Sequence, residues 1–200
     1  MMKWIKAAAG AVLVGLVLWV CGFVGACTTV RESVVRMHIL ANSDSEADQA
    51  VKMQVRDAVT AAGAGLLDGV TSRAEAEQRL QEALPRLTAV AQECVQKAGF
   101  SYPVKAELTE MYFMTRIYEN GTFPAGRYHA VRLSLGEAKG KNWWCVMYPP
   151  LCVSAATDKN SLRDVLPGEA CTVVEDGSRF VIRFKVLEWV QELAEWFSVK

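Results

Sequence analysis

Apolar residues change their spacing twice in the first half of the chain. Within residues 34–40 they alternate with other residues, which predicts a strand. Residues 43–62 then place apolar side chains at helical spacing, and a second helical pattern runs from residue 71 or 72 to Gly99. Both patterns carry charges opposite the apolar stripe, so each helix is expected to pack by one face. Pro85 lies inside the second pattern and is expected to kink or split that helix.

The second half of the chain consists of short apolar runs between turn residues, which indicates strands. Two of these runs, 127–136 and 142–148, flank the turn EAKGK, and we expect them to form a hairpin. Gly136 and Gly140 are the positions at this turn where a positive φ is expected. The other predicted elements are at least one strand in 102–118, a loop at 123–126, a polar loop at 154–170, a strand at 178–184 and an amphipathic helix at 185–197.

This order of elements predicts an α+β fold, in which two helices and a C-terminal helix pack on a mostly antiparallel sheet. A hydrophobic leader helix is expected before the fold, because MMKWIK supplies two lysines and residues 7–27 then carry no charge. Lysines before an uncharged apolar run are typical of a signal peptide. We therefore expect residues 1–27 to be a signal peptide or membrane anchor, and residues 28–200 to form a single exported domain.

The leader has three alternative fates. Cleavage after Ala26 would release a secreted product, because small residues precede that bond. The run VGAC also resembles the lipobox of bacterial lipoproteins, in which Cys27 would carry the lipid. An uncleaved anchor is the third fate, since about 20 apolar residues are long enough to cross a bilayer.

The composition narrows the class of protein. With 52% hydrophobic and 22% charged residues, the chain is globular rather than disordered. Its net charge is zero, and without the two leader lysines it has 22 − 2 = 20 basic and 22 acidic residues. No basic patch or run of like charge is present, so nucleic-acid binding has no support. We expect no nucleic-acid partner, no small-molecule substrate and no cofactor.

The stretch HILANSDSEADQ holds a histidine, two serines and three acids within twelve residues. Ser43, Asp44 and Glu46 fit a capping box at the start of the first predicted helix. The alternative is a hydrolase with Ser43 as nucleophile and His38 as base, but no G-x-S-x-G motif accompanies the serine. Capping is therefore favoured. It requires neither His38 nor Asp48, so these two are candidates for partner contact or a buried polar bond.

Four cysteines lie beyond the leader: Cys94, Cys145, Cys152 and Cys171. Outside the cytoplasm they permit two disulfides, and a bond between Cys145 and Cys152 would close a small loop. The alternative makes Cys145 a nucleophile with His129, on the neighbouring predicted strand, as its base. No C-x-x-C motif occurs and the chain has only two histidines, so no metal site is expected.

Trp143 and Trp144 are adjacent, so a strand would direct them to opposite faces. One of them can enter the core. The other would lie outside with Tyr148 and the prolines Pro149 and Pro150, of which Pro150 could form a cis bond. An exposed aromatic residue beside a proline loop suits a partner-binding anchor, and the alternative is that the C-terminal helix covers it.

Three segments carry long motifs of unusual composition: RMHILANSDSEADQAVKMQVRDAV, PAGRYHAVRLSLGEAKGKNWWCVMYPPLC and the tail RFKVLEW. With these motifs the chain resembles the stage II sporulation protein R family of endospore-forming bacteria, from about Val34 to Trp189. The matching positions are Arg36, His38, Ala41, Asn42, Ser43, Asp44, Asp48, Gln49, Lys52, Arg56, Asp57, Pro124, Ala125, Gly126, Tyr128, Arg132, Gly136, Gly140, Asn142, Trp143, Trp144, Cys145, Pro149, Pro150, Leu151 and Cys152.

The resemblance implies a signalling protein rather than an enzyme, and it carries over no catalytic residue. Such proteins are made in the forespore and exported into the space between the forespore and mother-cell membranes. There they trigger a membrane-embedded aspartic protease of the mother cell, which removes the pro-sequence of sigma-E. An uncleaved leader would add the membrane as a partner. The expected contact positions are His38, Asn42, Ser43, Asp44, Asp48, Arg56, Tyr128, Arg132, Asn142, Trp143, Trp144, Pro149 and Pro150.

Overall fold

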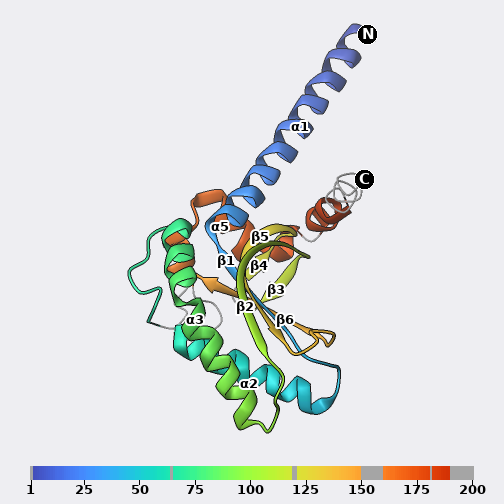
Figure 1. Cartoon of the computed structure of the whole chain (residues 1–200). Helices are drawn as coiled ribbons and strands as arrows, with labels where there is room; N and C mark the ends of the chain where they lie inside the picture. Colours follow the sequence, from blue (N-terminus) through green and yellow to red (C-terminus); the bar gives the residue numbers. More distant parts are fainter. Residues whose placement is uncertain (1, 64, 119–120, 150–159, 181, 190–200) are drawn as a thin grey trace. The chain divides into compact units, whose positions relative to one another are not determined.

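The structure is a computed structural model that describes residues 2–63, 65–118, 121–149, 160–180 and 182–189 (Figure 1). The chain divides into two compact units. The first unit comprises Met1–Arg31, Met114–Gly126 and Leu166–Lys200, and the second comprises Glu32–Phe113 and Arg127–Val165.

The second unit is built on a four-stranded sheet with the strand order β2-β5-β1-β6. Its strands are β1 (Val35–Leu40), β2 (Val104–Phe113), β5 (Gly126–Leu135) and β6 (Asn142–Tyr148). β1 runs parallel to β5 and antiparallel to β6. The N–H of Gly136 donates to the carbonyl of Pro103 at 2.9 Å, so the start of β2 lies beside the end of β5 and these strands run in opposite directions. The sheet is therefore mostly antiparallel.

The expected hairpin of residues 127–136 and 142–148 is wrong, because β1 lies between β5 and β6. The turn at 137–141 does connect the two strands, as predicted, but it passes over the end of β1. β1 is buried on both faces, which suits a central strand better than an edge strand. The short-range alternation that suggested a hairpin cannot reveal such a long-range insertion.

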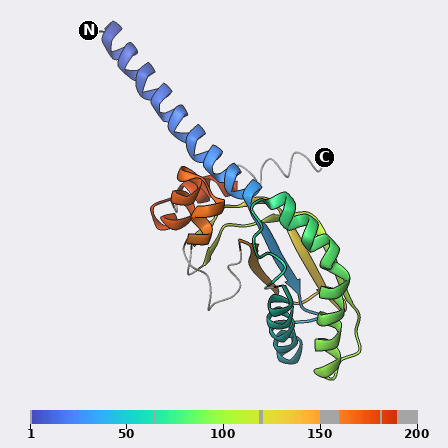
Figure 2. The same ribbon diagram turned by 90° about the vertical axis from the view of Figure 1, so that its left-hand side faces the viewer.

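Two long helices, α2 (Glu46–Gly63) and α3 (Arg73–Lys97), cover one face of this sheet (Figures 1 and 2). Their buried residues join the inward side chains of all four strands in one core, and the core includes Met37, Val55, Leu87 and Val131. The short helix α4 (Asn160–Val165) follows in the same unit. The two-layer arrangement confirms the predicted α+β class.

The ends of α3 agree with the sequence prediction. Ser72 is the N-cap, and its side chain accepts from the N–H of Glu75 at 3.3 Å. The helix ends at Lys97 and Gly99 follows with a φ of 86°. Pro85 does not split the helix. It is exposed, so water can satisfy the carbonyl group that the proline ring leaves without a donor.

The first unit contains α1 (Met2–Ser33) up to Arg31, the antiparallel pair β3 (Arg116–Tyr118) and β4 (Gly121–Phe123), α5 (Gly168–Glu175), the 3-10 helix η1 (Gly177–Phe180) and the helical residues 182–189. Its core joins Phe23 and Cys27 of α1 to Val173, Phe184 and Leu187. The predicted N-terminal helix is present. Within the described ranges, no helix combines the length and apolar character needed to cross a membrane.

Two local predictions were wrong, and a third was confirmed apart from its end residues. The strand expected at 178–184 is instead η1 followed by a helix, because Phe180, Phe184 and Leu187 share one helical face and pack in the core of the first unit. The loop expected at 123–126 is present at residues 124–125, between the end of β4 and the start of β5. The loop expected at 154–170 contains α4 and the start of α5, while residues 154–159 lie outside the described residues. The described part of the predicted C-terminal helix, up to Trp189, is helical.

Candidate interaction face of the sheet

The sheet face opposite α2 and α3 carries a row of polar and aromatic side chains that crosses all four strands. His38 in β1 pairs with Trp144 in β6 on one side and with Arg132 in β5 on the other. Arg132 then reaches β2, where its Nη1 lies 3.6 Å from Oε1 of Glu107. We call Trp144, His38, Arg132 and Glu107 the cross-sheet row. It combines three of the predicted contact residues in one place.

His38 is held tightly at the centre of the cross-sheet row. Its ring stacks on Trp144 with a centroid distance of 3.9 Å and an interplanar angle of 2°. Nε2 lies 2.9 Å from Oδ1 of Asn142, and because an amide oxygen only accepts, the proton is on Nε2. Burial, with a smaller contribution from the charge of Arg132, lowers the pKa of His38 to about 4. The ring is therefore neutral at neutral pH.

This lowered pKa predicts a stability change in mild acid. The unfolded chain takes up a proton on His38 below pH 6.5, whereas the folded chain does so only near pH 4. The contribution of neutral His38 to the free energy of unfolding is thus fully present above pH 6.5. It decreases by about 3 kcal/mol as the pH falls to 4. Urea unfolding measured across this pH range tests the prediction. His38→Gln, which cannot titrate, is expected to flatten the dependence, and an equally steep dependence in that variant would contradict the assignment.

Beside the cross-sheet row lies a second cluster of aromatic and cationic groups that is fully buried. The guanidinium carbon of Arg36 lies 4.2 Å from the ring centroid of Phe113 and 5.0 Å from that of Tyr128. All three side chains are at most 1% exposed. Phe113 also meets Trp144 edge-on at 4.8 Å. Tyr128, a predicted contact residue, therefore serves as packing beneath the face rather than as part of its surface.

The part of this face that solvent reaches is smaller and carries opposite charges. The Arg132 side chain is 39% exposed and the Glu107 side chain is 35% exposed. Trp144 is partly exposed and Asn142 is exposed. An arginine and a tryptophan fixed by rigid strands are the residue types that most often contribute binding energy at interfaces. On this surface a protein partner can contact the aromatic ring of Trp144, the amide of Asn142 and the charged pair of Arg132 and Glu107.

A different set of predicted contact residues forms the junction between β1 and α2. Asp48 is 4% exposed, and its Oδ2 accepts from Oγ of Ser43 at 2.5 Å and from Nδ2 of Asn42 at 3.0 Å. Its Oδ1 accepts from the hydroxyl of Tyr102 at 3.0 Å. This network explains why Asp48 belongs to the motif, as the alternative of a buried polar bond had suggested.

The predicted capping box at this junction is displaced by two residues. Ser45, not Ser43, caps α2, and its Oγ accepts from the N–H of Asp48 at 3.2 Å. Ser43 instead bonds the Asp48 carboxylate and also accepts from the N–H of Ser45 at 3.2 Å. Ser43 is followed by Glu46 and Ser45 by Asp48 three positions later, so both serines fit the broader S-x-x-[DE] pattern and spacing alone could not separate them. Glu46 is the first residue of the helix and is exposed.

The turn at 137–141 closes over this junction through backbone contacts. Oδ1 of Asn42 accepts from the N–H of Glu137 at 2.9 Å, and Oδ1 of Asp44 accepts from the N–H of Lys141 at 2.7 Å. Nζ of Lys52, a residue only 5% exposed, donates to the carbonyl of Lys141 at 3.0 Å. Asn42, Ser43, Asp44 and Asp48 are thus brought together, and their side chains bond other groups of the protein, although Asp44 itself is exposed.

Glycine is required at two places where the turn meets the junction. Gly136 has the predicted positive φ, at 55°, whereas Gly140 does not have one. Gly140 is instead required for space, because a Cβ there would lie 2.1 Å from the carbonyl oxygen of Ser43. At φ 54° the left-handed position in the turn is occupied by Ala138.

Gly140→Ala is expected to lower the free energy of unfolding by about 1–3 kcal/mol, because the backbone of Ser43 must move to admit the methyl group. Gly65→Ala is the matched control, since a Cβ at Gly65 meets no atom within 4 Å. Urea unfolding of both variants followed by circular dichroism gives the comparison. Equal midpoints for the two variants would contradict the close approach.

The adjacent tryptophans point to opposite faces, as predicted. Trp143 packs against the core on the helix side, and the guanidinium carbon of Arg56 lies 4.7 Å from its ring centroid. Trp144 lies on the other face in the cross-sheet row. Arg56 also pairs with Asp57 at 2.5 Å. Arg56 and Trp143 therefore form a contact separate from the cross-sheet row.

The geometry opposes both nucleophile–base pairs considered from sequence. His129 and Cys145 lie on β5 and β6, and the intervening β1 separates these strands by about 10 Å, which is two strand spacings. Nδ1 of His129 instead lies 3.2 Å from Oε1 of Glu77. Ser43 donates to Asp48, whereas His38 pairs with Asn142. Neither histidine is within hydrogen-bond reach of its proposed nucleophile.

The cysteines and prolines at the end of β6 are only partly described. Among the described residues, Cys21, Cys27 and Cys94 have free thiols, and Cys145 does not. Cys152 and Pro150 lie outside the described residues, so the Cys145–Cys152 disulfide and the cis bond at Pro150 stay predictions. Pro149 is buried and follows a cis peptide bond after Tyr148. The described residues contain no group of acids, cysteines and histidines that could hold a metal ion.

Comparison with known proteins now decides the family. A family model described as Stage II sporulation protein R (spore_II_R) matches residues 31–158, which is more than half of the chain. The chain belongs to the stage II sporulation protein R family. A protein of Bacillus subtilis (strain 168) named Stage II sporulation protein R is 33% identical over 187 residues, covering 82% of this chain and 83% of that protein. No solved structure matches.

Three residues of the site were missed in the sequence. Tyr102 completes the bonds to Asp48, Glu107 ends the cross-sheet row, and Phe113 supports both Arg36 and Trp144. Alternation in β2 could have placed Glu107 and Phe113 on one face, since they are six positions apart. No local signal connects Tyr102 to Asp48, because the two residues lie 54 positions apart.

Proposed function

We propose that this chain is an exported sporulation signal that activates a membrane-embedded aspartic protease of the mother cell. The activated protease would then remove the pro-sequence of sigma-E. Membership of the stage II sporulation protein R family is the observation that carries this proposal. The apolar segment behind the leader lysines supports export into the space between the forespore and mother-cell membranes.

In this proposal the protein acts by binding and not by catalysis. Ser43 is bonded to Asp48, while His129 and Cys145 lie on strands separated by β1, so neither pair supports a nucleophilic mechanism. The Cys145–Cys152 disulfide, if formed after export, would close the chain at the end of β6.

We infer that the solvent-accessible part of the cross-sheet row, together with Asn142, contacts the protease. Arg132 and Trp144 are partly exposed, whereas Asn42, Ser43 and Asp48 use their polar groups inside the junction. The motif thus divides into residues that shape the fold and residues that remain available to a partner. Arg56 and Trp143 are assigned to the first group because they contact each other on the helix side.

Co-expression of this chain with the protease and pro-sigma-E tests the function. Processing of pro-sigma-E, followed by immunoblot, is expected only when the chain is present and its leader directs it out of the cytoplasm. A catalytically inactive protease is the control that assigns the cleavage to the protease. Equal processing with and without this chain would overturn the proposal.

A further inference from the structure

The two halves of α1 differ in their surroundings. In the first half, Trp4 and Val12 are 82% and 72% exposed. Toward the end of the helix, Phe23 is 8% exposed and Cys27 is 0% exposed. A leader that only directs export has no need of such burial, because it is removed or lies apart from the folded protein.

Residues of α1 are part of the core of the first unit. The ring of Phe23 lies 5.6 Å from that of Phe180 and 5.5 Å from that of Phe184. Ala26 and Cys27 belong to the same buried cluster as Phe184 and Leu187. The helical residues after η1 therefore bury their apolar face against α1 itself.

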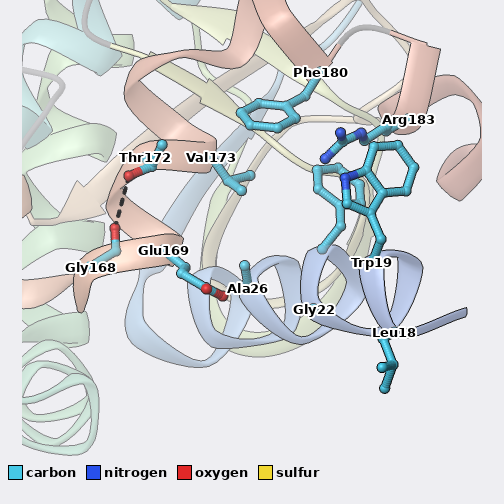
Figure 3. A pocket seen from close by; sticks show the side chains of 11 residues that line it. Leu18, Trp19, Gly22, Ala26, Gly168, Glu169, Thr172, Val173, Phe180 and Arg183 are labelled. Carbon is cyan, nitrogen blue, oxygen red and sulfur yellow. Dashed lines mark hydrogen bonds between the residues drawn. The ribbon is translucent and has the colours of Figure 1, made fainter. Parts of the chain in front are cut away.

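Polar contacts tie the same stretch of α1 into the first unit. The guanidinium carbon of Arg183 lies 3.4 Å from the ring centroid of Trp19 and 5.4 Å from that of Phe23. Figure 3 shows Trp19 and Arg183 side by side, in a pocket that α1 lines together with α5. Further along the helix, Nη1 of Arg31 donates to the carbonyl of Ala125 at 3.2 Å.

The segment after β4 also contacts α1 closely, at Gly126. A Cβ at Gly126 would lie 2.4 Å from Cδ of Arg31, and φ of Gly126 is 143°, so this position admits only glycine while Arg31 stays in place. Contacts with α1 thus come from η1, from the helical residues that follow it and from the segment after β4.

We propose that the stretch of α1 from Trp19 to Arg31 is a permanent part of the first unit, so that the folded protein keeps this helix after export. Of the three fates considered for the leader, this excludes cleavage after Ala26. Cleavage there would remove Trp19, Phe23 and Ala26 and would expose the apolar side chains that they cover, including Phe184. It also excludes a lipid on Cys27, whose side chain is enclosed by the core.

Two cysteines on the same helix provide a direct test. Cys21 is exposed and Cys27 is buried, so in the purified full chain Cys21 is expected to react with iodoacetamide at least about tenfold faster than Cys27. Burial also raises the pKa of the Cys27 thiol to about 12, which slows its reaction further. Peptide mass spectrometry measures both rates. In denaturant the two rates are expected to converge, and equal rates in the folded chain would overturn the proposal.

A pair of substitutions on α1 separates docking from helix formation. Phe23→Asp is expected to speed limited proteolysis within residues 177–189 by at least about tenfold, because the core loses its central ring. Val14→Asp is the control, since Val14 is 58% exposed on the same helix. Equal proteolysis of the two variants would contradict docking.

The mass of the exported protein gives the final outcome. A chain that retains residues 19–31 is expected, and a mature N-terminus at Cys27 or beyond would overturn the proposal. These results do not depend on whether the protein activates a protease, so failure of either proposal leaves the other testable.

Discussion

Asp48→Ala is expected to lower the free energy of unfolding by about 3–5 kcal/mol. The substitution leaves the donors of Ser43, Asn42 and Tyr102 without their shared acceptor in a site that is almost closed to water. Each donor left unsatisfied costs about 1–3 kcal/mol. Asp48→Asn keeps the shape of the side chain but replaces one acceptor oxygen with a donor. Its free energy of unfolding is therefore expected to fall by about 1–2 kcal/mol, which is less than for Asp48→Ala.

Urea unfolding of the full chain measures these losses. Asp57→Ala is the matched control on the same helix, because the Asp57 side chain is 67% exposed and its loss is expected to change stability by less than about 0.5 kcal/mol. If Asp48→Ala were as stable as Asp57→Ala, the hydrogen bonds to the Asp48 carboxylate would not stabilise the fold as expected.

The same carboxylate gives stability a second pH dependence, below that of His38. Burial alone would raise the pKa of Asp48, but the hydrogen bonds from Ser43, Asn42 and Tyr102 outweigh it and hold the pKa below the usual value. A depressed pKa means that the stabilisation is present above about pH 4 and is lost as the pH falls through the folded-state value. Asp48→Asn is expected to remove this lower step and to leave the His38 step in place.

Arg132→Glu is expected to reduce the processing of pro-sigma-E by at least about tenfold in the co-expression assay. Arginine is enriched among the few interface residues that each contribute about 2 kcal/mol or more, and about 1.4 kcal/mol already corresponds to a factor of ten in affinity. The reversal also places two acids side by side, because Glu107 lies 3.6 Å from Arg132. The single variant alone therefore cannot separate partner binding from local repulsion.

The double variant Arg132→Glu/Glu107→Arg makes that separation. It restores opposite charges within the pair but exchanges their positions on the surface. If the partner binds each charge at its original position, processing of pro-sigma-E is expected to stay low. Recovery of normal processing would mean that the pair matters only inside the protein. Arg86→Glu provides the control for a charge reversal elsewhere, because Arg86 is exposed on α3, in the other layer. Processing of pro-sigma-E is expected to be normal with Arg86→Glu.

Periodicity predicted the elements of the first half well, because each depends on neighbours in sequence. Residues 34–40 alternate and form β1, and the cap at Ser72 follows from local chemistry. The sequence could not place β1 between β5 and β6, since this order depends on pairing between distant residues. The error had a functional consequence, because the presumed neighbours His129 and Cys145 are separated by that strand.

The sequence indicated some residues of the candidate site, but it did not show which of them face solvent and which bond other groups of the protein. The motif positions Asn42 and Asp48 are predicted contact residues, yet they bond each other within the junction. Arg132 and Trp144 are predicted contact residues from the same motifs, and both are partly exposed. A motif records that a residue matters without recording whether it faces a partner or the protein's interior.

The central position of β1 also determines when this fold can form. β1 is made before the other strands of its sheet, but its two neighbours belong to the second half of the chain, and His38 meets Asn142 across 104 positions of sequence. The first strand must therefore wait for almost all of the second unit to be synthesised, and such distant contacts make folding slow. The order of the strands therefore keeps the second unit from folding until most of the chain has been synthesised.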